Sequence, residues 1–299
     1  MAVAADISRR KRAAAWLSVA SNTGAFLLKL AAAVLTGSSA VLSEAAHSLS
    51  DLTASVIALF SVRAADRPAD QSHPFGHEKI EHVSGVVEGA MILAAAVGVV
   101  VLALANFGNP VSHSGWGIAV MLGTAAVNVL VGRRVRKVGH ETRSAALEAD
   151  AAHLSADVLT SLGAAAALAL VSVTGIRALD AIVACAIAVL VARTGLQLVV
   201  AGTRVLVDEA IPENEVAIVH EVLDGTEGIH GWHRLRARRA GATRHIDLHL
   251  LVDPSMSVAR AHAITDVIEA ELERRLSGAD VVIHIEPATH VPAPDEALL

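Results

Sequence analysis

Two pairs of ionisable residues lie inside long apolar segments of the chain. His47 and Asp51 fall within residues 38–61, and His153 and Asp157 fall within residues 151–171. On a helix, this spacing places both side chains of a pair on one face, one turn apart. Because an ionisable group in a membrane span is energetically costly, such residues usually serve a function. Two imidazoles and two carboxylates on facing helices predict a tetrahedral site for a divalent metal ion.

The donor atoms of this predicted site indicate which metals it would accept. Two nitrogen and two oxygen ligands suit Zn²⁺, and they also suit Co²⁺, Cd²⁺ or Fe²⁺. A site made of carboxylates alone would favour Mn²⁺. The chain has a single cysteine, Cys185, so a disulfide framework is excluded and a metal site built from several thiolates is not expected.

Two further groups of ligand-type residues lie outside the apolar segments. Asp70, His73 and His77 are close together in a polar loop, which predicts a surface metal site. In the last third of the chain, His284 and Glu286 alternate with apolar residues and so share one face of a predicted strand. A bound metal is predicted in this tail from five residues: His233, His249, His262, His284 and Glu286.

The composition indicates a membrane protein with a soluble tail. The chain has 299 residues, of which 54% are hydrophobic and only 18% charged, and its mean hydropathy is +0.53. A bilayer span needs roughly 20 apolar residues, and six segments meet this requirement. They are residues 13–35, 39–64, 83–107, 116–135, 145–173 and 179–200. We therefore predict an all-α, six-helix transmembrane domain over residues 1–207.

Basic residues indicate the orientation of these spans. One set of turns contains almost none, and the opposite ends hold most of them: Arg9, Arg10, Lys11, Arg12, Arg63, Arg67, Lys79, Arg133, Arg134, Arg136 and Lys137. By the positive-inside rule, both termini are cytoplasmic. Other polar residues within the spans are interpreted as helix-to-helix contacts or as side chains that snorkel to the surface. They are Asn22, Lys29, Glu88, Asn128, Asp180, Arg193 and Gln197.

The tail, residues 208–299, has the pattern of a small α+β domain. Helices are predicted over residues 212–223 and 258–276, and strands over residues 232–238, 245–252 and 281–286. The resulting order αββαβ suggests one helical layer on one sheet.

Taken together, these residues resemble the cation diffusion facilitator family of divalent-metal/proton antiporters over nearly the whole chain. The two span pairs match the family's transport-site motifs, and PADQSHPFGHEK (residues 68–79) matches its loop site. The tail motifs HRLRAR, IDLHL, ARAH and VVIHIEP match its cytoplasmic metal-binding domain. The resemblance implies the same three ligand groups, a homodimer and a ferredoxin-like tail.

Two positions depart from common family patterns. His47 stands where one bacterial subgroup has aspartate, and the resulting ligand set resembles the zinc-preferring subgroup. Glu286 stands where aspartate is common, and its longer side chain could still ligate a metal.

We therefore expect a dimeric transporter in a bacterial inner membrane that exports Zn²⁺ in exchange for protons. Zn²⁺ would be both the cargo and a regulator bound by the cytoplasmic tail. The expected partners are divalent metal ions, protons, the lipid bilayer and a second copy, without nucleic acid. One alternative keeps transport but changes the cargo to Fe²⁺, Co²⁺, Cd²⁺ or Mn²⁺. Another is a membrane-anchored metal sensor without flux, and a third is an intramembrane metal hydrolase with Glu44 as general base.

Overall fold

The computed structural model describes residues 2–36, 39–105, 107, 115–176 and 178–289. The chain divides into two compact units, one ending at Thr203 and the other beginning at Arg204. Each unit has its own buried apolar core, so each is described by itself.

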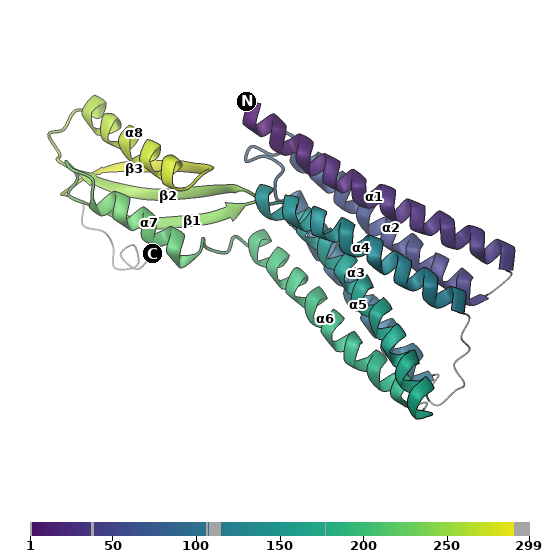
Figure 1. Ribbon diagram of the computed structural model, residues 1–299. Coiled ribbons are helices and arrows are strands. Elements are labelled where there is room, and N and C mark those ends of the chain that lie inside the picture. The colour runs from purple at the N-terminus through teal and green to yellow at the C-terminus, as the bar shows by residue number, and fades with distance from the viewer. Residues whose placement is uncertain (1, 37–38, 106, 108–114, 177, 290–299) are drawn as a thin grey trace. The chain divides into compact units, whose positions relative to one another are not determined.

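The first unit is built of long helices, as a chain that crosses a bilayer requires, because a helix satisfies its backbone hydrogen bonds internally. Its elements are α1 (Ala2–Thr36), α2 (Ser39–Ala65), α3 (Ile80–Ala105), α4 (Gly115–Thr142), α5 (Ala145–Thr174) and α6 (Ala178–Leu206) (Figure 1). Among the described residues, four segments are long and apolar enough to span a membrane. They are His47–Ala65, Ile80–Ala105, Ala145–Val171 and Ala178–Leu206.

One helix shows clearly how the sequence sets its ends. The side chain of Ser144 accepts a hydrogen bond from the Leu147 backbone N–H and caps the start of α5. The helix ends at Gly175, which has a φ of 71° that glycine adopts without steric cost. Thirty helical residues therefore run between two sequence-encoded caps, and His153 and Asp157 lie one turn apart within them.

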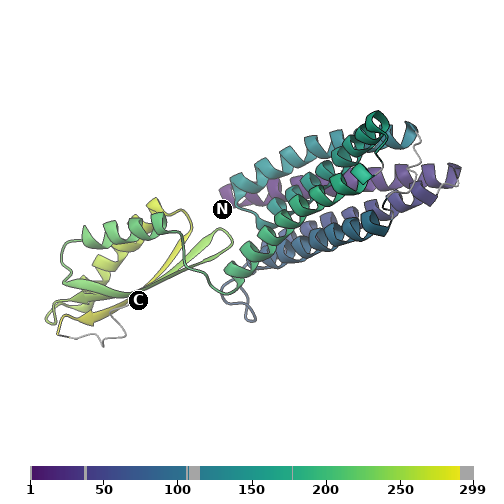
Figure 2. The same ribbon diagram turned by 90° about the horizontal axis from the view of Figure 1, so that it is seen from below.

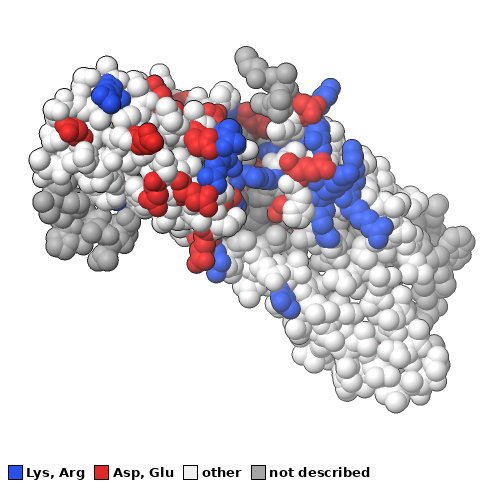
Figure 3. Space-filling view, turned by 60° about the vertical axis from the view of Figure 1, so that its left-hand side comes forward, with Lys and Arg blue, Asp and Glu red and all other residues white. Residues whose placement is uncertain are grey.

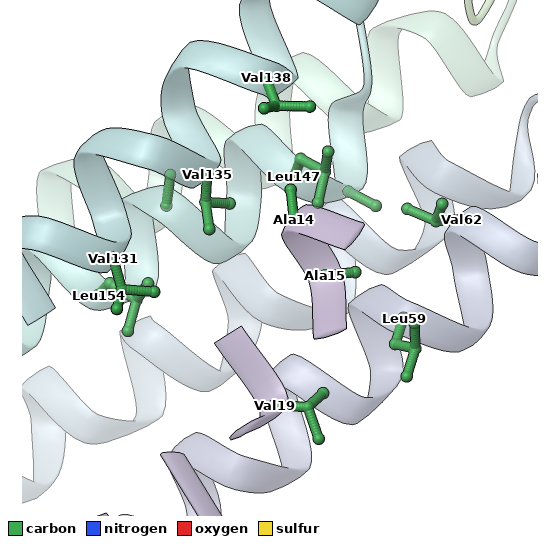
Figure 4. Close-up of a cluster of buried hydrophobic side chains, with 12 residues drawn as sticks. Ala14, Ala15, Val19, Leu59, Val62, Val131, Val135, Val138, Leu147 and Leu154 are labelled. Atoms are coloured by element: carbon green, nitrogen blue, oxygen red, sulfur yellow. The ribbon is translucent and has the colours of Figure 1, made fainter. Parts of the chain in front are cut away.

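A buried apolar cluster fills one half of the helical unit. Ala14, Val19, Leu59, Val135 and Leu154 belong to it, and they come from α1, α2, α4 and α5 (Figure 4). Elsewhere α3 and α6 approach closely through glycines. A Cβ on Gly89 would lie 2.8 Å from the Gly195 carbonyl oxygen, so this contact excludes larger residues.

The second unit is a three-stranded sheet with two helices. Its elements are α7 (Glu213–Asp224), β1 (Gly231–Ala240), β2 (Thr243–Val252), α8 (Val258–Arg275) and β3 (Ala279–Pro287). The strand order is β1-β2-β3, with β1 antiparallel and β3 parallel to β2. The observed order of elements is the predicted αββαβ, and Figure 2 shows both helices on the same face of the sheet.

Strand β2 shows how alternation assigns the two faces of this sheet. Ile246, Leu248 and Leu250 are buried in the core together with Ile268 and Leu272 of α8. Because side chains alternate along a strand, the odd-numbered residues of β2 lie on the other face, away from the helices.

A buried ion pair joins α7 to the start of β2. Arg244 is 2% exposed, and its Nε and Nη2 donate to the two carboxylate oxygens of Glu215 at 2.8 and 2.6 Å. Arg239 also donates to Glu215, at 2.6 Å. Removing one partner would leave a buried charge without its counter-charge.

We predict that Glu215→Ala lowers the free energy of unfolding of residues 204–299 by about 3–5 kcal/mol at neutral pH. The hydrogen bond from Arg244 lowers the pKa of Glu215 below its ordinary value. The contribution is therefore fully present above that ordinary value and is lost as the pH falls through the lowered pKa. Urea unfolding at several pH values measures this. Glu271→Ala is the control, since its partner Arg274 is exposed. Equal losses in both variants would contradict the prediction.

Candidate metal-transport site

The structure brings the four predicted transport ligands together from α2 and α5. The His47 Nε2 lies 3.8 Å from both Asp51 Oδ1 and Asp157 Oδ1, and the His153 Nε2 lies 3.4 Å from Asp51 Oδ1. Tetrahedral ligands at about 2.0 Å from Zn²⁺ would be about 3.3 Å apart. The ligand atoms of His47, Asp51 and Asp157 all lie within 4.8 Å of one another, so these three could hold one ion, and His153 lies next to them through Asp51.

Burial differs among the four residues. The side chains of Asp51, His153 and Asp157 are almost fully buried, whereas the His47 side chain is 46% exposed. All four line a cavity of about 550 Å³. The cavity continues past Leu102 near the end of α3 and Asp180 near the start of α6. The buried apolar cluster lies on the other side of the ligands, toward the starts of α1 and α5 and the ends of α2 and α4.

A network of hydrogen bonds between buried polar groups lies next to the ligands of α2 and α5. The Asn22 side-chain N–H donates to the Asp51 carbonyl oxygen at 3.4 Å and to Ser55 Oγ at 2.6 Å. Ser18 and Ser55 donate to Asp150 Oδ1 at 3.0 and 3.2 Å. This network joins α1, α2 and α5 at the level of the site. No local motif singles out Asp150, although it precedes His153 by about one helical turn.

The cavity lining also changes the interpretation of three polar residues of the spans. Lys29, Asn128 and Asp180 line the same cavity as the four ligands. Lys29 is 6% exposed, so of the two interpretations drawn from the sequence, a helix-to-helix contact or snorkelling, snorkelling to the surface does not apply. The sequence shows the polar residue types but not the shared cavity, because three different helices supply them.

The loop residues predicted to bind metal are also close together. Asp70 Oδ1 lies 3.5 Å from His73 Nδ1, and Asp70 Oδ2 lies 3.4 Å from His77 Nε2. The backbone N–H groups of His73 and Ser72 donate to Asp70, and the bond from His73 is the main cause of its lowered pKa. The Asp70 carboxylate is therefore held ionised, as a metal ligand must be.

In the soluble unit, four of the five predicted tail residues gather on the strands. His233, His249 and His284 lie opposite one another in the register of β1, β2 and β3. Glu286 accepts from His233 Nε2 and His249 Nδ1 at 2.9 Å each, and His284 Nε2 lies 3.5 Å from it. Three imidazoles around one carboxylate could hold a divalent metal ion.

His262 does not join this group within the soluble unit of one chain. It lies on α8, is exposed, and its Nε2 is 3.7 Å from Asp266. His249 lies on the sheet face away from the helices, so the sheet separates it from His262.

These features define a class: a multi-pass membrane protein with an internal polar cavity, joined to a soluble domain with metal-ligand side chains. Residues 15–207 match the family model for the cation efflux transmembrane domain, and residues 211–288 match the model for the cation efflux protein, cytoplasmic domain. The chain therefore belongs to the cation diffusion facilitator family, which confirms the resemblance seen in the sequence.

Individual relatives cover most of the chain. The cation-efflux pump FieF of Pectobacterium atrosepticum is 35% identical over 89% of this chain and 89% of its own length. The uncharacterized transporter sll1263 of Synechocystis sp. is 34% identical over 94% of this chain and 91% of its own length. Among solved structures, the metal-bound C-terminal domain of the CzcD transporter from Thermotoga maritima is 34% identical. It covers 27% of this chain and 100% of that chain, with a TM-score of 0.26.

Family membership settles the general activity. The chain is a metal efflux transporter with divalent metal ions as cargo, it forms homodimers, and it is not an enzyme. The alternative of an intramembrane hydrolase is therefore wrong. Glu44, its suggested base, lies outside the residues whose side chains the structure describes.

Proposed function

We propose that the chain exports Zn²⁺ across a bacterial inner membrane and admits protons in return. The observation that carries this proposal is the geometry of His47, Asp51, His153 and Asp157. Ligand atoms of His47, Asp51 and Asp157 lie within 4.8 Å of one another, His153 lies 3.4 Å from Asp51, and all four residues line one cavity within the helical unit. Two nitrogen and two oxygen donors suit Zn²⁺ better than Mn²⁺.

The proposed arrangement has six spans in residues 1–207 and a cytoplasmic, ferredoxin-like domain in residues 208–299. Lys and Arg side chains gather at one end of the helical unit on the face that Figure 3 shows. By the positive-inside rule, this distribution supports a cytoplasmic location for this end and for both termini. The cavity extends from the ligands away from this end, which supports a state open to the outside.

Charge balance supports an exchange of metal for protons. With the ion bound, two ionised aspartates offset its charge, and both histidines are neutral because they ligate through nitrogen. With the ion gone, the site retains two negative charges that are costly in a membrane interior. Protons on the histidines would restore neutrality, since imidazole titrates near neutral pH. The balance is thus about two protons per zinc ion.

We assign the loop and tail groups to regulation by the same metal. Asp70, His73 and His77 would bind Zn²⁺ at the surface of the helical unit. His233, His249, His284 and Glu286 would bind it in the tail, and His262 would join them only through a second copy of the chain.

Transport into sealed proteoliposomes tests the function and its alternatives together. Purified chain is reconstituted with a metal-sensitive dye inside, and Zn²⁺, Fe²⁺, Co²⁺, Cd²⁺ and Mn²⁺ are supplied in turn. We expect the fastest uptake with Zn²⁺. Faster uptake of another metal would change the assigned cargo, and metal binding without any uptake would contradict transport and favour the sensor instead.

His47 provides a prediction about selectivity. His47→Asp replaces a nitrogen ligand by an oxygen ligand, which favours harder ions. We expect the ratio of Zn²⁺ to Mn²⁺ flux to fall about tenfold, which is the lower end of the effect of changing a group that supports a metal ligand. His140→Asp is the control, since His140 lies on α4 outside the cavity. An unchanged metal profile in the His47 variant would show that His47 does not select.

The proposed metal site in the tail predicts that Zn²⁺ makes the tail more stable against unfolding. Zn²⁺ that binds the folded tail and not the unfolded chain raises its free energy of unfolding by about 4 kcal/mol at a thousandfold excess over Kd. We therefore expect residues 204–299 to melt at a higher temperature with Zn²⁺ and to lose this shift in Glu286→Ala. No shift in the unchanged tail at saturating Zn²⁺ would contradict the tail site.

A further inference from the structure

The transport cavity contains charged residues beyond the four ligands. Among the described residues that line it, four carry a charge besides the histidines: the ligands Asp51 and Asp157, Lys29 of α1 and Asp180 of α6. Lys29 is 6% exposed, so protein surrounds it almost fully. It lines the same cavity as the Asp157 carboxylate. Asp180 lies in the first turn of its helix, where the helix dipole favours a negative charge.

These groups give the cavity a definite charge. At neutral pH lysine is positively charged and aspartate negatively charged. Counted over the described lining residues, three carboxylates and one ammonium group give a formal charge of −2 when both histidines are neutral. One divalent cation balances the summed charge of these described groups. Glu88 and Asp150 are buried nearby but do not line the cavity. Their contribution is the same in every variant compared below.

We propose that Lys29 and Asp180 carry opposite charges that together set how tightly the cavity binds its metal cargo. Lys29 repels the bound cation, which weakens binding and speeds release. Asp180 attracts the cation from the start of α6 and keeps the lining at the charge that a divalent ion balances. This inference rests on the proposed zinc transport, because it assigns two residues that govern turnover at that site.

Removing one charge or the other should shift the KM of zinc transport in opposite directions. Without the Lys29 charge, zinc should bind more tightly in the cavity and leave more slowly. We expect Lys29→Met to lower both KM and the maximal rate of zinc flux, each by on the order of tenfold. Asp180→Asn removes an attraction instead, so KM should rise by a similar factor.

The double variant Lys29→Met/Asp180→Asn separates charge from structure. It restores the formal charge of −2, so KM and maximal rate should return to within about threefold of the unchanged chain. A purely structural role of either residue gives the opposite result, because two structural losses add. Lys29→Arg keeps the charge and should leave both parameters nearly unchanged. Lys137→Met is the matched control, since Lys137 is exposed on α4.

Zinc flux into proteoliposomes is measured over a range of zinc concentrations for all five variants and the unchanged chain. The proposal is supported by opposite shifts of KM in the single variants and by recovery in the double variant. Unchanged KM in Lys29→Met and Asp180→Asn overturns it, and so does a double variant that is worse than either single one. If the unchanged chain itself shows no flux, the proposed function fails instead, so the two failures are distinct.

Discussion

Replacing either Asp51 or Asp157 by alanine is expected to reduce zinc flux at least about a hundredfold while the protein stays folded. Loss of groups that merely support a metal ligand costs about ten- to hundredfold in affinity, so loss of the ligand itself should cost more. Each substitution also removes one of the two negative charges that offset the ion. The effect should therefore appear in both KM and maximal rate.

Two controls make this prediction specific. Asp6→Ala removes an exposed carboxylate of α1 that pairs with Arg9, so flux should remain unchanged in that variant. Gel filtration and thermal melting check that the Asp51 and Asp157 variants remain folded. Flux near the unchanged rate in either purified variant would remove these residues from the site.

The second large effect concerns protons. We expect an inward proton gradient to drive zinc export, and acid on the outer side to speed zinc release, because protons neutralise the emptied ligands. Imposing a gradient of one pH unit with the membrane potential clamped should increase zinc flux several-fold, since one unit is worth about 1.4 kcal/mol per proton.

His153→Ala tests which group receives the protons. If His153 is a carrier, any transport that survives in the variant should depend less on the pH gradient than that of the unchanged chain. The control is His140→Ala, on α4 outside the cavity. A gradient dependence equally steep in His153→Ala would place the protons on other groups, such as the aspartates.

The four membrane ligands could be predicted because their signal is local. A histidine and an aspartate four residues apart share a helical face, and their rarity in apolar spans marks them. The pairing of α2 with α5 follows from the repeated pattern, which only two spans carry. Alternation is an equally local signal, and along β2 and β3 it assigns His249, His284 and Glu286 to defined strand faces from the sequence alone.

The remaining features depend on contacts between distant segments. Lys29 and Asp180 are 151 positions apart, and nothing in either local sequence shows that they line one cavity. Asp150 resembles any other polar residue until Ser18 and Ser55 are seen to donate to it. Arg244 lies next to a predicted turn, where an arginine is usually exposed, yet it is buried and donates to Glu215 of α7. Periodicity assigns a face to each residue but does not identify the partner that the face meets.

An exchange of zinc for protons through His47, Asp51, His153 and Asp157 is tested most directly by counting both ions. Zinc and protons are followed in the same proteoliposomes, with a zinc dye and a pH dye inside and the membrane potential clamped. We predict that zinc uptake is matched by about two protons moving outward per zinc ion, and that both movements vanish in Asp157→Ala. Zinc uptake without proton movement, or proton movement that persists in Asp157→Ala, would contradict the exchange.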